Sequence, residues 1–185
     1  MSKVVVLLAE GFEEIEALTP VDLLRRAGIE VVTASITEDP VVMGSHKIPV
    51  TADTTLSSLE GTADLLFLPG GQPGTNNLKG SEAVAELIRK YLAEGKYLTA
   101  ICAAPTVYGQ MGLLQGRKAT CYPGLEGQLT GAQWTGEKVT VAVDGQFVTS
   151  RGMGTSIDFG LKLIELLISK DKADEMTAKV VYQRG

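Results

Sequence analysis

The sequence predicts an α/β fold with a mostly parallel central sheet. Continuous apolar runs alternate along the chain with segments in which apolar residues recur at the helical period, as in stacked βαβ units. The runs are apolar throughout, which is typical of strands that are covered by helices on both faces. We find no repeat, linker or low-complexity stretch in the 185 residues. One domain over residues 1–185 is therefore expected.

The order of elements follows from these runs. Strands are expected at residues 4–9, 29–34, 64–68 and 98–101, with a short strand pair near 48–51 and a hairpin of 138–143 with 146–150. Helices are expected at residues 14–27, 81–94, 103–111, 155–168 and 171–180. Gly28 is a candidate helix C-cap and Ser81 a candidate N-cap, and Asp144-Gly145 is a hairpin turn signal.

Composition and charge limit the possible functions. The formal net charge of −5 with scattered Lys and Arg gives no basic surface for nucleic acid. No apolar run reaches the roughly 20 residues of a membrane span, and the N-terminus lacks the pattern of a secretory signal. Two cysteines form no disulfide framework, so a cytoplasmic protein is expected. One histidine and two cysteines cannot supply an ordinary zinc site, so neither a metal nor another cofactor is expected.

Cys102 is the candidate nucleophile. It follows an apolar strand directly, and the small residues Ala100, Ala103 and Ala104 around it permit a sharp strand-to-helix turn. A helix N-terminus lowers the pKa of a thiol, so we expect an activated thiolate with a pKa below about 8.5. The competing interpretation is a buried, inert cysteine, which is the common state of free cysteines.

Two further segments end on the same side of the predicted sheet. In Pro69-Gly70-Gly71, the N–H groups of the two glycines are expected to form an oxyanion hole above Cys102 together with that of Ala103; an ordinary glycine turn is the alternative. Glu16 lies one turn into the first helix. Pro20 has no N–H group to donate a hydrogen bond to the carbonyl of Glu16, so the helix should be distorted there. A carboxyl group facing the thiolate there would be protonated and would shuttle protons. A plain surface position for Glu16 is equally compatible with the sequence.

Several motifs together resemble the ThiJ/PfpI superfamily, and within it the branch of the parkinsonism-associated protein deglycase. They are residues 9–16 (AEGFEEIE), 20–22 (PVD), 25–28 (RRAG), 68–71 (LPGG), 100–105 (AICAAP), 149–152 (TSRG) and 154–156 (GTS). The likeness runs over nearly the whole chain. Each motif alone is weak, whereas the combination is highly specific.

The resemblance implies a flavodoxin-like three-layer sandwich that is usually a homodimer. It implies a nucleophilic, oxidation-sensitive Cys102, a protonated partner in Glu16, and oxyanion-hole amides at Gly71 and Ala103. The activities it implies are cofactor-free conversion of methylglyoxal-like 2-oxoaldehydes, repair of their early adducts, chaperoning and peroxide sensing.

The chain departs from the family pattern at two positions. Tyr122 replaces a histidine that many relatives carry; its phenol is a possible substrate contact but a poor base at pH 7, because tyrosine ordinarily has a pKa of about 10. Met153 stands where close relatives often carry proline.

Two functions stay open on the sequence: a glyoxalase or deglycase acting on a small carbonyl substrate, and a redox-sensing or chaperone protein that uses oxidation of Cys102. A cysteine peptidase or a glutamine amidotransferase is disfavoured. Both need a histidine base, and His46 lies upstream in an irregular region.

Overall fold

The computed structural model describes residues 2–136 and 138–183. A seven-stranded sheet has the order β10-β11-β7-β6-β1-β2-β5. Its strands are β1 (Lys3–Leu8), β2 (Glu30–Ser35), β5 (Thr54–Thr55), β6 (Leu65–Leu68), β7 (Tyr97–Ile101), β10 (Val141–Asp144) and β11 (Phe147–Ser150). Every neighbouring pair is parallel except the hairpin of β10 and β11.

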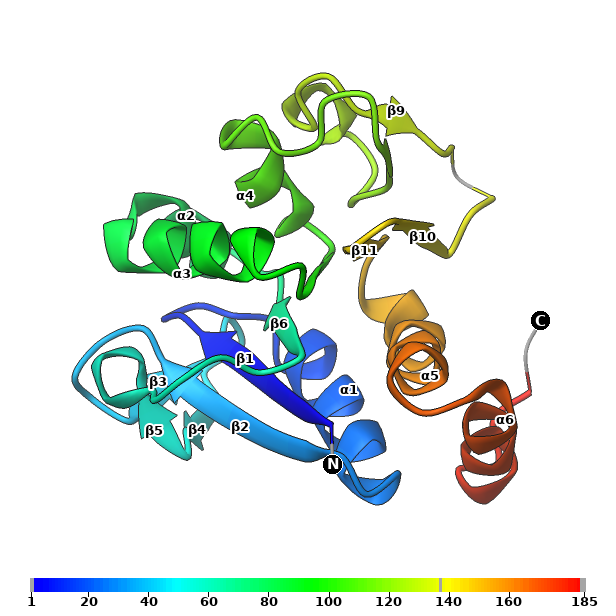
Figure 1. The fold of residues 1–185 in the computed structure, drawn as a ribbon. Helices are drawn as coiled ribbons and strands as arrows, with labels where there is room; N and C mark the ends of the chain where they lie inside the picture. Colours follow the sequence, from blue (N-terminus) through cyan, green and yellow to red (C-terminus); the bar gives the residue numbers. More distant parts are fainter. Residues whose placement is uncertain (1, 137, 184–185) are drawn as a thin grey trace.

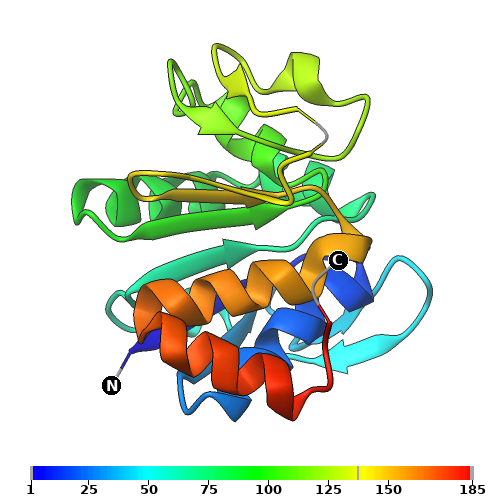
Figure 2. The ribbon, with the colours of Figure 1, turned by 90° about the vertical axis from the view of Figure 1, so that its right-hand side faces the viewer.

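Helices cover both faces of this sheet (Figures 1 and 2). One face carries α1 (Glu14–Arg26), α5 (Ser156–Leu167) and α6 (Lys170–Lys179), and the other carries α2 (Gly74–Gly80), α3 (Glu82–Ala93) and α4 (Pro105–Gln110). Gly28 follows α1 with φ +84°, and the side chain of Ser81 accepts from the amide of Val84 at the start of α3. The expected three-layer α/β architecture is confirmed.

Two apolar cores lie between the layers. Along β1, Val4, Val6 and Leu8 pack on the side of α1 and α5, whereas Val5 and Leu7 pack on the side of α3. Successive side chains of a strand point to opposite faces, so a strand between two helical layers must be apolar at every position. This is why the strand runs read as continuous in the sequence.

Smaller elements lie outside the main sheet. A short strand pair was expected near residues 48–51; strand β4 (Pro49–Thr51) lies there and pairs antiparallel with β3 (Val41–Met43). Strand β8 (Lys118–Ala119) pairs in parallel with β9 (Gln133–Trp134). Single 3₁₀ turns occur at η1 (Leu56–Ser58), η2 (Glu126–Gln128) and η3 (Met153–Thr155). None of the helices in the described segments combines the length and apolarity needed to cross a membrane.

The structure corrects several element boundaries. No helix was expected between residues 69 and 81, but Gly74–Gly80 forms helix α2, although Gly74, Asn76 and Asn77 are weak helix formers. The helix expected at 103–111 starts at Pro105, because Cys102 to Ala104 form the turn itself. The hairpin strand expected from residue 138 starts at Val141.

Candidate active site

The candidate site lies where the chain order of the sheet reverses. Strand β1 has β2 on one side and β6 on the other, and β7 follows β6. Ligands of open α/β sheets bind outside the carboxyl ends of the strands at such a point. Cys102 follows β7, Gly70 and Gly71 follow β6, and the loop after β1 leads into α1, which carries Glu16.

Cys102 adopts an unusual backbone conformation. Its φ of +64° lies in the left-handed region that residues other than glycine seldom occupy. Its amide donates to the carbonyl of Ser150 (3.0 Å), and its carbonyl accepts from the amide of Tyr122 (2.7 Å). Such strain costs about 1–3 kcal/mol and is held by surrounding structure, often at functional sites. The half-buried thiol therefore sits in the sharp turn that the sequence predicts.

Glu16 is a buried carboxyl group that faces the thiol. Its exposed fraction is 2%, which settles the choice between a surface and a buried position. Burial raises the pKa of Glu16 to about 7, and the charge of Glu13 adds to this effect. Hydrogen bonds from the thiol of Cys102 and the amides of Gly70 and Met153 lower the pKa of Glu16 but do not offset burial. Oε2 has no hydrogen-bond partner among the described residues.

The thiol does not have the lowered pKa that its position suggested. Burial raises the pKa of Cys102, and the neighbouring Glu16 raises it further; the amides of Ala103 and Gly71 oppose these effects without reversing them. The expected lowering is wrong in direction, because desolvation and the carboxyl group outweigh the two amides and the short helix α4. Burial thus disfavours the charged form of both groups, and the carboxyl group and the thiol compete for a single negative charge.

The glycine turn after β6 brings the backbone close to both groups. A β-carbon at Gly70 would lie 2.5 Å from Oε2 of Glu16 and 2.6 Å from Cβ of Cys102. At Gly71, whose φ is +94°, a β-carbon would lie 2.3 Å from the amide nitrogen of Glu13. The amide of Glu13 also donates to the carbonyl of Gly70 (2.9 Å). Only glycine permits these close approaches, so the close packing of the turn against Cys102, Glu16 and Glu13 requires glycine at both positions.

Gly152 closes the site on the side of β11. A β-carbon there would lie 3.5 Å from Cδ2 of Tyr122, 3.8 Å from Oε1 of Glu16 and 4.0 Å from Sγ of Cys102. Four segments thus meet at one small volume, and Tyr122 is among them, as the sequence suggested. The role of Gly152 was missed. Its signal was present in the 149–156 motif, but nothing in the sequence placed that glycine over the thiol.

Comparisons with known proteins show the family of this chain. The family model of DJ-1/PfpI proteins matches residues 2–166. The chain belongs to the DJ-1/PfpI family. It is 40% identical over 183 residues to protein DJ-1 homolog B of Arabidopsis thaliana, covering 98% of this chain and 42% of that protein. This chain thus spans less than half of homolog B, and likewise covers 45% of the Arabidopsis homolog A.

Two further members of the DJ-1/PfpI family match over nearly their full lengths. The glutathione-independent glyoxalase DJR-1.2 of Caenorhabditis elegans is 30% identical over 178 residues, which are 95% of this chain and 93% of that protein. The oxidized DJ-1 of Toxoplasma gondii superposes with a TM-score of 0.92 at 38% identity, and both chains are covered completely. The flavodoxin-like fold expected from the resemblance is thus confirmed.

In this DJ-1/PfpI chain the sole histidine belongs to a carboxylate cluster at the start of α1. The exposed imidazole of His46 lies 3.3 Å from a carboxylate oxygen of Glu13 and of Glu14. Its backbone amide donates to Glu14 (2.8 Å), and the hydroxyl of Ser45 donates to Glu13 (2.9 Å). Among the described residues this is the one group whose ligand atoms lie close enough to hold a metal ion. Hydrogen bonds from residues 45 and 46 already stabilise both carboxylates.

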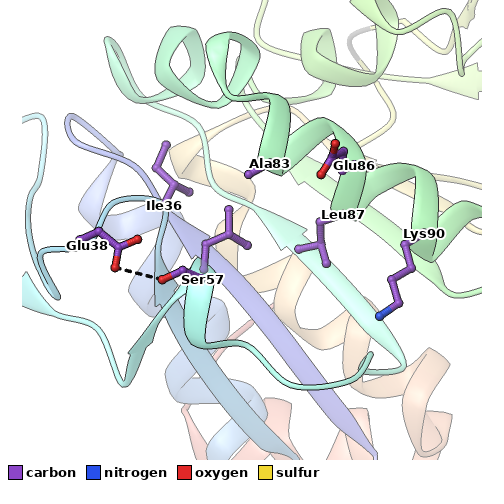
Figure 3. Close-up of a pocket in the computed structure, with 8 residues that line it drawn as sticks. Ile36, Glu38, Ser57, Ala83, Glu86, Leu87 and Lys90 are labelled. Atoms are coloured by element: carbon purple, nitrogen blue, oxygen red, sulfur yellow. Dashed lines mark hydrogen bonds between the residues drawn. The ribbon is translucent and has the colours of Figure 1, made fainter.

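A separate pocket of about 340 Å³ lies between α3 and the β2–β5 edge (Figure 3). Ile36 and Leu87 point into it, and Ser57 donates to Glu38 at its rim (3.1 Å). None of its lining residues belongs to the site around Cys102.

Proposed function

We propose that this chain is a cysteine-dependent, cofactor-free glyoxalase or deglycase that acts on methylglyoxal-like 2-oxoaldehydes or their early adducts. The observation that carries the proposal is the pairing of a half-buried thiol with a buried carboxyl group whose pKa is raised to about 7. A general acid–base works best when its pKa lies near the working pH. The name of the C. elegans relative, a glutathione-independent glyoxalase, supports the same reaction.

The reaction begins with attack of Cys102 on the aldehyde carbon. The carboxylate of Glu16 takes the thiol proton as the carbon–sulfur bond forms, so no preformed thiolate is needed. The amides of Gly71 and Ala103, which already act on the sulfur, stabilise the developing oxyanion. Glu16 then returns the proton to that oxygen, which gives a neutral hemithioacetal and restores the carboxylate.

Isomerisation and hydrolysis complete the turnover. Glu16 removes the proton from the sulfur-bearing carbon, and the hydroxyl proton of the hemithioacetal passes to the ketone oxygen. Glu16 then delivers its proton to the adjacent carbon, so the ketone becomes an alcohol and the hemithioacetal becomes a thioester. Water adds to the thioester carbonyl and expels the thiol of Cys102, which releases the hydroxy acid. Methylglyoxal thus gives lactate with no net oxidation. The phenol of Tyr122, whose ring lies beside the same space, contacts the substrate oxygen.

The test is formation of lactate from methylglyoxal in a buffer without primary amines, with chelator present and glutathione absent. Cys102→Ser should abolish turnover. Glu16→Gln keeps the size of the side chain but removes proton transfer, so kcat should fall by about 10²–10⁴-fold. Circular dichroism confirms that both variants fold. Wild-type activity in Glu16→Gln, or lactate that does not depend on Cys102, would refute the mechanism.

Redox sensing, with or without a chaperone role, is the second candidate. The specific observation is that the sulfur lies beside the amides of Gly71 and Ala103, which would hold sulfinate oxygens. Two molecules of peroxide would each transfer one oxygen to the sulfur and leave as water. Mass spectrometry of peroxide-treated protein tests this, and it requires two oxygens on Cys102 but none on Cys121.

We also propose that this single-domain chain, residues 1–185, forms a homodimer in the cytoplasm. Apolar side chains remain exposed on α1 at Ile15 (47%) and Leu18 (36%), and a hollow beside Leu18 is lined by Ile157 and Val180. Exposed apolar patches of this kind suit a second copy of the chain. Both cysteines are free, which supports a reducing compartment. Leu18→Asp should convert the dimer to monomer in analytical ultracentrifugation, and an unchanged mass would contradict this interface.

A further inference from the structure

We infer that Gly152 sets the upper size of the substrate, because the side chain that it lacks would occupy the space in which the substituent of the 2-oxoaldehyde must lie. The inference rests on the proposed function for its substrate class. Gly152 itself transfers no proton. It acts only through the space that its lack of a side chain leaves beside the reacting atoms.

The position of the missing side chain carries the inference. An added β-carbon would be in van der Waals range of three groups at once, namely the ring of Tyr122, Oε1 of Glu16 and Sγ of Cys102. A substrate bonded to the sulfur and deprotonated by Glu16 must lie between these same groups. A methyl group at residue 152 would therefore compete directly with the carbons of the bound substrate.

The backbone at Gly152 does not itself demand glycine. Its φ of 163° and ψ of −166° are extended values that any residue adopts. No neighbour lies closer than 3.5 Å to the added β-carbon, so alanine fits without a clash. The loop is also held independently, since the amide of Gly152 donates to the hydroxyl of Thr155 (3.2 Å), which lies 2.7 Å from that of Ser150. The empty space thus has no structural cause in the loop.

Other atoms limit the space that is left for a substrate beside residue 152. The backbone of Gly70 approaches the same two residues so closely that a β-carbon there would overlap Glu16 and Cys102. The ring of Tyr122, 3.5 Å from the added β-carbon of residue 152, is half-exposed. We therefore expect a bound 2-oxoaldehyde to place a hydrogen or a methyl group beside the thiol, and larger groups to displace Tyr122.

The test compares Gly152→Ala with Gly154→Ala. Gly154 belongs to the same loop, but a β-carbon there has no neighbour within 4 Å. A hydrophobic contact of one methyl group is worth about 10–200-fold in kcat/KM. Gly152→Ala should therefore lower kcat/KM for methylglyoxal at least about tenfold more than for glyoxal, which lacks the methyl group. Gly154→Ala should leave the preference between the two substrates unchanged. Equal losses on both substrates with an unchanged melting temperature would overturn the inference.

Modification of Cys102 gives a readout that does not need turnover. In Gly152→Ala, alkylation by iodoacetamide should slow at least about tenfold, whereas oxidation by the smaller hydrogen peroxide should change less than about twofold. The wild-type protein, compared with free glutathione, should discriminate strongly against N-substituted, bulkier iodoacetamides. If the wild type shows this size dependence but no turnover, the proposed function fails and the size limit stands. If bulky and small reagents react in the same ratio as with glutathione, the size limit is wrong even where turnover is found.

Discussion

Replacing Glu16 by glutamine should change how the stability of the fold depends on pH. Burial raises the pKa of Glu16 from 4.5 to about 7 in the folded protein, so the folded state holds this proton more tightly than the unfolded chain does. Below pH 4.5 both states are protonated and the group has no effect. Between pH 4.5 and 7 the unfolded chain ionises first, so unfolding becomes easier, and above pH 7 the full effect remains.

The pKa shift sets the size of the effect. One pKa unit corresponds to about 1.4 kcal/mol, so a shift from 4.5 to about 7 costs the wild type about 3 kcal/mol of stability at pH 8. Glu16→Gln is neutral at every pH and avoids this cost. Its free energy of unfolding relative to wild type should therefore increase by about 3 kcal/mol from pH 4 to pH 8. Urea denaturation under reducing conditions measures both proteins, and taking their difference cancels the titrating groups that do not interact with Glu16.

If the charge lay on the thiol and not on the carboxyl group, the stability of the fold would change with pH in the opposite direction. If Cys102 were the group that ionises first, with a pKa below about 8.5, the thiolate would make the wild type more stable as pH rises towards 8.5. Cys102→Ser would remove that gain. Two results would refute a carboxyl group that ionises before the thiol. One is a difference in the free energy of unfolding between wild type and Glu16→Gln that stays constant from pH 4 to pH 8. The other is a free energy of unfolding of the wild type that increases relative to that of Cys102→Ser above pH 6.

Two further predictions concern packing and the second cysteine. Gly70→Ala should destabilise the fold by about 1–3 kcal/mol in urea denaturation, because its β-carbon would lie 2.6 Å from Cβ of Cys102; Gly127→Ala, which has open space and no positive φ, is the matched control and should cost less than about 0.5 kcal/mol, and equal costs would contradict the steric argument. Burial raises the pKa of the Cys121 thiol to about 12, and the residue is 2% exposed. Iodoacetamide should therefore label Cys121 at least about tenfold more slowly than Cys102 in the native protein, and readily only after unfolding. Comparable native rates, resolved by peptide mass spectrometry, would show that Cys121 is accessible.

The layers of this fold were predictable because their physical cause is local. A strand covered on both faces must be apolar at every position, and β1 shows this in its run of valines and leucines. Likewise, the turn at Cys102 follows from the small residues beside it. Helix α2 was not predictable, because its glycine and asparagines carry no helical pattern and its conformation depends on the close approach of residues 11 and 12.

The site was only partly predictable, since its electrostatics are not local. The position of Cys102 beside a helix start suggested a low thiol pKa, but the direction is set by burial and by a carboxyl group from another segment. Glu16 could be a surface or a buried residue until the tertiary packing was known. Gly152 carries no chemical group at all, so only the folded structure reveals what its missing side chain leaves open.

The wide separation of the site residues along the chain has a consequence for protein synthesis. Glu16 and Gly152 are 136 residues apart in the sequence, and they meet only after β1, β6, β7 and β11 have paired in parallel. Pairing over such distances forms slowly. Until β11 joins β7, the amide of Cys102 has no hydrogen bond to the carbonyl of Ser150, and Gly152 does not yet lie beside the thiol. A growing chain on the ribosome therefore exposes a solvent-accessible thiol that aldehydes and peroxides can modify. A chain modified at this stage would fold with a blocked Cys102 and could not carry out chemistry at this sulfur.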